Sequence, residues 1–75
     1  MKSKHIIDKL LGYTVVTIDD DDKRQLLREA DRLLEKQWAE RDIISYLKYT
    51  EEINPDLEED YALSKMGKIR EKYES

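Results

Sequence analysis

The sequence predicts a small, mostly helical domain of about four helices with one short strand-like segment at residues 13–18. Apolar residues recur three and four positions apart in several separate stretches, which is the spacing of an amphipathic helix. The charges come in blocks: residues 19–22 are four aspartates, and residues 51–60 hold six acidic side chains and no basic one. Each block precedes a helical stretch, where carboxylates accept hydrogen bonds from free amide N–H groups and favour the positive end of the helix dipole.

The length and the residue types limit how such a fold can be held together. Seventy-five residues make one domain, residues 1–75, with a small core. The chain has no cysteine, so it has neither a disulfide framework nor a thiolate metal site. The fold must therefore rely on packing, and pairing with a second copy is another way to bury surface.

The first helix is expected to end at Gly12, after an N-cap at Ser3. Its apolar stripe is Ile6, Ile7, Leu10 and Leu11. Segment 13–18 is rich in β-branched residues and favours a strand. A lone strand needs a partner for its backbone, so it is either a solvent-facing edge or pairs with the same strand of another copy.

The longest helix is expected over about residues 21–38, beginning at the four aspartates. One face of it holds Leu27, Ala30, Leu34 and Trp38, with Leu26 and Leu33 beside them. A third helix is expected from Glu40 to about Ile53. Neither Gly nor Pro separates these two helices, so one continuous helix is the competing interpretation.

A firm break is expected at Asn54-Pro55, because a residue before proline disfavours helix. The final helix then starts at Pro55 or Asp56 and runs to about Tyr73. The expected core of the whole domain is Ile7, Leu10, Leu27, Ala30, Leu34, Trp38, Ile43, Leu47, Met66 and Ile69.

The sequence has few residues in patterns suited to catalysis or metal binding, so we expect that the protein is not an enzyme and binds neither a cofactor nor a metal. His5 is the only histidine, no serine lies in a Gly-x-Ser-x-Gly motif, and two glycines cannot build a phosphate loop. The run Asp19–Asp22 lacks the turn glycine and distant glutamate of a calcium loop, which favours a helix cap. No apolar run approaches a membrane span and the first residues do not form a signal peptide, so a cytoplasmic protein is expected.

The favoured function is a non-catalytic protein-protein interaction module, such as a small regulator or inhibitor. Tyr and Trp dominate binding hot spots, and acidic side chains attract a basic partner. The predicted partner-binding residues are Trp38, Tyr46, Tyr49, Glu51, Glu52, Asp56 and Glu59. Such a chain suits a bacterial or phage inhibitor of a basic, nucleic-acid-handling target, and a homodimer is compatible with it.

The alternative function is a dimeric DNA-binding transcriptional regulator. The order strand, helix, helix resembles ribbon–helix–helix proteins over about 35 residues, and the second and third helices are similar in order to a helix-turn-helix. The alternative nucleic-acid face is Lys65, Lys68 and Lys72, which share one side of the last helix. The strand itself offers no Arg or Lys to base edges, and the net charge of −4 opposes general attraction to phosphate.

Overall fold

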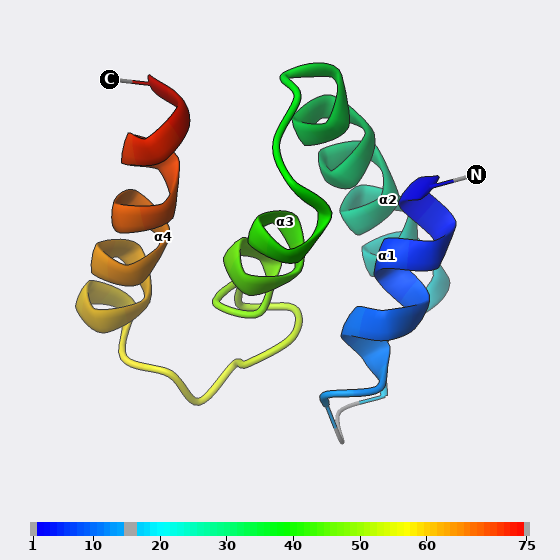
Figure 1. The fold of residues 1–75 in the computed structure, drawn as a ribbon. Coiled ribbons are helices and arrows are strands. Elements are labelled where there is room, and N and C mark those ends of the chain that lie inside the picture. The colour runs from blue at the N-terminus through cyan, green and yellow to red at the C-terminus, as the bar shows by residue number, and fades with distance from the viewer. Residues whose placement is uncertain (1, 15–16, 75) are drawn as a thin grey trace.

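A computed structural model describes residues 2–14 and 17–74 and contains four helices there, as predicted. They are α1 (Lys2–Leu11), α2 (Asp20–Glu35), α3 (Glu40–Leu47) and α4 (Glu59–Glu74). Figure 1 shows α1, α2 and α3 gathered together, with α4 standing beside α3 at one edge. The backbone of α4 lies close to α3 but not to α1 or α2. The position of α4 therefore depends on its packing against α3 and the residues that precede α3.

The expected strand is not formed at the described positions of segment 13–18. Tyr13 lies in a turn, Thr14, Thr17 and Ile18 have no regular structure, and Val15 and Val16 lie outside the described residues. The Tyr13 N–H donates to the Leu10 carbonyl at 3.0 Å. The Thr14 hydroxyl donates to the Ile53 carbonyl at 3.2 Å. The described ends of this segment are thus used to join α1 to the connection between α3 and α4.

The four aspartates begin α2, as predicted. Asp19 is the N-cap in extended conformation, and its Oδ1 accepts a hydrogen bond from the Asp22 N–H at 2.9 Å. The next three aspartates fill the first turn, where amide groups point toward them without partners inside the helix. The block therefore starts a helix.

The break between α2 and α3 is a left-handed turn centred on Gln37, so the interpretation of one continuous helix is wrong. Gln37 has φ of 66°. Its N–H donates to the Leu34 carbonyl at 2.9 Å, and the Trp38 N–H donates to the Leu33 carbonyl at 3.1 Å. This pair of bonds is the Schellman motif, which is usually built on glycine. The sequence signal was hidden because glutamine occupies the glycine position.

The core lies between α1, α2 and α3, and it differs from the expected one mainly along α2. Leu26 and Leu33 are buried there, while Leu27 and Leu34 are half-buried at its margin. Because the leucines occur in adjacent pairs, either member of each pair could face the core. Packing against α1 and α3 buries the first leucine of each pair, Leu26 and Leu33. Met66 and Ile69 of α4 also pack only partly buried against the core. Among the described residues, the buried apolar ones are Ile6, Ile7, Leu10, Leu26, Ala30, Leu33, Trp38, Ile43, Tyr46, Leu47, Ile53 and Ala62.

The third helix ends earlier than predicted and the fourth begins later, because residues 48–58, which join α3 to α4, form turns. α3 ends at Leu47, whose carbonyl accepts a hydrogen bond from the Thr50 hydroxyl at 2.6 Å. The Leu57 N–H donates to the Asn54 carbonyl at 3.3 Å, closing a turn with Pro55 at its second position, where proline is favoured. This turn delays the start of α4 to Glu59.

An aromatic and ionic clamp, formed by Trp38, Asp42, Lys72 and Tyr73, fixes the C-terminal part of α4. The Trp38 and Tyr73 rings stack with centroids 4.6 Å apart and planes 11° apart. The Tyr73 hydroxyl donates to Asp42 and accepts from the Ala39 N–H at 3.0 Å. Lys72 Nζ lies 3.2 Å from Asp42 Oδ1. The hydrogen bond from Tyr73 and the charge of Lys72 hold the Asp42 pKa below its ordinary value.

Replacing Gln37 by glycine is expected to stabilise the protein. Glycine adopts positive φ without the steric cost that glutamine bears, so we expect the free energy of unfolding to rise by about 0.5–1 kcal/mol. Urea denaturation followed by circular dichroism measures this change. The control is Lys36→Gly at φ of −80°, which gains nothing from glycine and should destabilise. Equal effects of the two substitutions would contradict the role given to Gln37.

The clamp predicts a dependence of stability on acidic pH. The Asp42 pKa is lowered by folding, so its stabilisation is complete above the ordinary value of 3.8 and is lost as pH falls through the folded value. The gap in unfolding free energy between the wild type and Asp42→Asn should be widest near about pH 6 and shrink toward about pH 2. Urea titrations across this range measure the gap, and a gap that stays constant would refute the clamp.

Removing the hydroxyl in Tyr73→Phe tests the same clamp without changing its ring stacking. It should cost about 1–2 kcal/mol, because Asp42 and the Ala39 N–H each lose a partner. Tyr49→Phe is a suitable control, since the Tyr49 ring packs against Tyr61 outside the clamp. Equal losses in the two variants, measured by urea denaturation, would argue against a special contribution from Tyr73.

Candidate functional site

Two of the predicted partner-binding aromatics lie in the core. Trp38 is 4% exposed and Tyr46 is 8% exposed. Their rings meet edge to face with centroids 5.1 Å apart, and Tyr73 covers the other side of Trp38. The Trp38 indole N–H is buried without a hydrogen-bond partner in the described part of the chain. These rings hold α3 and α4 in place and offer little surface to a partner.

Four of the other five predicted residues line a groove between α4 and the connection that precedes it. We call this cavity of about 370 Å³ the α4 groove. Four predicted residues line it: Tyr49, Glu51, Glu52 and Glu59. Asp56 is exposed in the turn nearby but does not line it. The remaining lining residues are Thr50, Asn54, Leu57, Ala62, Leu63 and Met66. The groove thus combines carboxylates with aliphatic side chains.

The apolar side of the groove was missing from the sequence prediction. Leu63 is 57% exposed, whereas Ala62 on the adjacent position of α4 is buried. Leu63 falls outside the stripe of Ala62, Met66, Ile69 and Tyr73 by which α4 packs on the core. A large apolar residue off the packing stripe was the signal that could have revealed it. Tyr61 is 48% exposed and meets Tyr49 edge to face with ring centroids 6.3 Å apart.

The carboxylates of residues 51–60 are not neutralised by the rest of the described chain. None of the six acidic side chains in this block forms an ion pair with another described residue. The other acidic block lies close by: partial burial, together with the charges of Asp19, Glu52 and Asp21, raises the pKa of Asp22. Both blocks therefore contribute to one negative region, in which the carboxylates of residues 51–60 have no cationic partner within the described chain.

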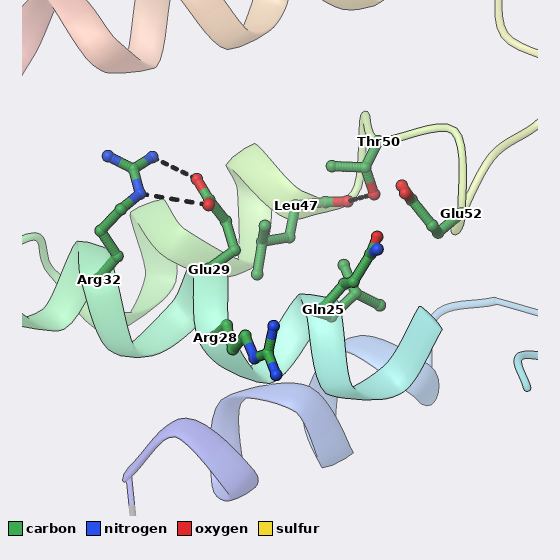
Figure 2. Close-up of a pocket in the computed structure, with 8 residues that line it drawn as sticks. Gln25, Arg28, Glu29, Arg32, Leu47, Thr50 and Glu52 are labelled. Atoms are coloured by element: carbon green, nitrogen blue, oxygen red, sulfur yellow. Dashed lines mark hydrogen bonds and ion pairs between the residues drawn. The ribbon is translucent and has the colours of Figure 1, made fainter. Parts of the chain in front are cut away.

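A second cavity, which we call the α2–α3 cavity, has a volume of about 430 Å³. Its apolar lining includes Leu26 and Leu47, both of which are buried. Figure 2 shows Gln25 and Arg28 projecting from α2, with Thr50 and Glu52 on the opposite side. At one end Arg32 makes two hydrogen bonds to Glu29, which neutralises that guanidinium. Arg28 has no ion pair within the described residues and remains the uncompensated cation of this cavity.

The alternative nucleic-acid face is partly occupied by contacts within the chain. Lys72 pairs with Asp42, and Lys65 Nζ lies 5.4 Å from the centre of the Tyr61 ring. Lys68 is exposed and lacks an ion pair with the described residues. One of the three lysines is therefore neutralised by the clamp that orients α4.

Metal-binding side chains do not cluster in the described part of the chain. No three or more His, Asp or Glu side chains converge there in a way that could hold a metal ion. None of the helices within residues 2–14 and 17–74 is long and apolar enough to cross a membrane. Comparisons with protein-family models, curated proteins and solved structures give no match.

Proposed function

We propose that this protein is a non-catalytic interaction module whose α4 groove binds a basic, amphipathic segment of another protein. The observation that carries the proposal is the meeting of unpaired carboxylates with the exposed side chain of Leu63 and the half-buried side chain of Leu57 in one cavity. Glu51, Glu52 and Glu59 supply the charge, and Leu57 and Leu63 supply apolar surface. A regulator or inhibitor acting in the cytoplasm is the role that such a module would serve.

The size of the groove supports an anchored mode of binding. About 370 Å³ lies near the lower end of the roughly 300–1,000 Å³ common for ligand sites. Such a volume suits one or two large apolar side chains of a partner, while the rest of its segment lies across the surface. A buried apolar anchor surrounded by polar contacts is how many interfaces obtain their affinity.

The charge of the groove supports a basic partner. Like charges that are close together repel one another, and a cationic segment would relieve this repulsion on binding. The carboxylates surround an apolar surface that water hydrates poorly, so a partner carrying both Lys or Arg and aliphatic residues matches both features. The contribution of these exposed charges should weaken as salt is added.

The test is a selection of peptides from a random phage-displayed library, with the full chain as bait. We expect selected peptides to combine Lys or Arg with large apolar residues. Their affinity, measured by fluorescence anisotropy, should fall about fivefold or more in Glu51→Lys and about tenfold in Leu63→Ser. Both side chains are exposed, so the variants should fold.

Matched controls separate the groove from general electrostatics. Glu58→Lys makes the same charge change in the same connection, but Glu58 does not line the groove. Tyr13→Ser removes an exposed apolar side chain, 70% exposed, elsewhere on the molecule. Peptides that respond equally to Glu51→Lys and Glu58→Lys, or that ignore Leu63→Ser, would refute the proposal.

The DNA-binding alternative is tested by electrophoretic mobility shift at two salt concentrations. Salt-sensitive binding to duplex DNA that is lost when Lys65, Lys68 and Lys72 are all replaced by Ala would favour that alternative. The variant Lys65→Ala/Lys68→Ala leaves the ion pair between Lys72 and Asp42 intact and controls for loosening of α4.

A further inference from the structure

The α4 groove and the α2–α3 cavity adjoin one another. Thr50 and Glu52 line both cavities, so the short segment 50–52 forms a ridge between them. On one side of the ridge lie Leu57 and Leu63, and on the other lie Leu26 and Leu47. A ligand that fills the α4 groove and continues over the ridge therefore enters the α2–α3 cavity.

The ridge is held in one conformation by hydrogen bonds. The Thr50 hydroxyl donates to the Leu47 carbonyl, and the Asn54 side-chain amide donates to the Lys48 carbonyl at 2.5 Å. The Ile53 and Asn54 N–H groups both donate to the Thr50 carbonyl, at 3.2 and 2.9 Å. Ile53 is buried, which ties the ridge to the core. A surface fixed in this way loses little conformational entropy when a ligand binds.

The unpaired charge changes sign across the ridge: Glu52 on the ridge lines both cavities, Glu51 and Glu59 line only the α4 groove, and Arg28 lines only the α2–α3 cavity. The α4 groove has unpaired carboxylates at Glu51, Glu52 and Glu59, as described above. The α2–α3 cavity has Arg28, whose guanidinium lacks a partner in the described chain, whereas Arg32 is neutralised by Glu29. An arginine so placed is suited to a carboxylate, which it can bind with two parallel hydrogen bonds.

From this we infer that the two cavities form one bipartite site for an extended peptide with a defined order of charges. Basic and apolar residues of the peptide occupy the α4 groove, a Lys or Arg crosses the ridge beside Glu52, and an acidic side chain or C-terminal carboxylate reaches Arg28. This inference rests on the proposed function and adds the order of charges that selects the partner. A purely basic peptide would satisfy only half of the site.

The experiment uses peptides of about ten residues selected on the full chain, whose extended reach of roughly 33 Å is close to the longest dimension of the molecule, 34 Å. We expect the selected peptides to contain an acidic residue or a free C-terminal carboxylate in addition to basic ones. Arg28→Glu should weaken their binding about fivefold or more. Changing the acidic residue of the peptide to Lys should restore binding to Arg28→Glu, as a charge-swap cycle requires.

Arg24→Glu is the matched control, because Arg24 is an exposed arginine on the same helix that lines neither cavity. Peptides that depend on Glu51 and Leu63 but respond equally to Arg24→Glu and Arg28→Glu would overturn the bipartite site and leave the proposed function standing. Peptides insensitive to Glu51→Lys and Leu63→Ser would overturn both. Sedimentation equilibrium tests whether the chain self-associates. Self-association that is lost in Arg28→Glu would show that a second copy occupies the site, and would overturn the proposal that a peptide does.

Discussion

The left-handed turn at Gln37 is the constraint on which the arrangement of this domain depends. It ends α2 and brings Trp38 back against Leu33, so that the indole enters the core rather than continuing along a helix. The buried indole then provides the surface on which Tyr73 stacks. Because α4 packs against α3 but not α1 or α2, this contact and the hydrogen bond from Tyr73 to Asp42 determine where α4 stands. The α4 groove exists only because α4 is held in that position.

The existence of the helices could be predicted from the sequence. Some of their ends, and the face by which each helix packs on the core, could not. The capping role of Asp19 follows from local chemistry, and so does the break at Asn54-Pro55. The end of α2 has no glycine to mark it, and the choice between Leu26 and Leu27 as the buried residue is made by α1 and α3. The strand expected at 13–18 rested on propensity, which tertiary contacts such as that of Thr14 with Ile53 override at the described positions.

In the site, too, features set by neighbouring residues could be predicted from the sequence, whereas features set by residues distant in the chain could not. Composition alone marked residues 51–60 as a surface of carboxylates, and the cavity lies where Glu51, Glu52 and Glu59 are found. The burial of Trp38 was predicted, but its contacts were not, because its ring meets Tyr46 on one side and stacks on Tyr73, more than thirty positions away, on the other. Arg28 could not be identified either, since its lack of a partner depends on the pairing of Arg32 with Glu29 and on the position of the ridge.

The two acidic blocks contain the same kind of side chain, yet their energetics differ. Asp19 accepts a backbone hydrogen bond and offsets the repulsion among its neighbours by capping α2. In residues 51–60, Glu59 and Asp60 gain only the favourable end of the α4 dipole. Glu51 and Glu52 precede the helix on the ridge and lack even that compensation, while Glu52 adds to the repulsion felt by Asp22. In the complex proposed above, basic residues of the bound segment would offset this repulsion, and its apolar residues would contact the aliphatic side chains that line the same groove.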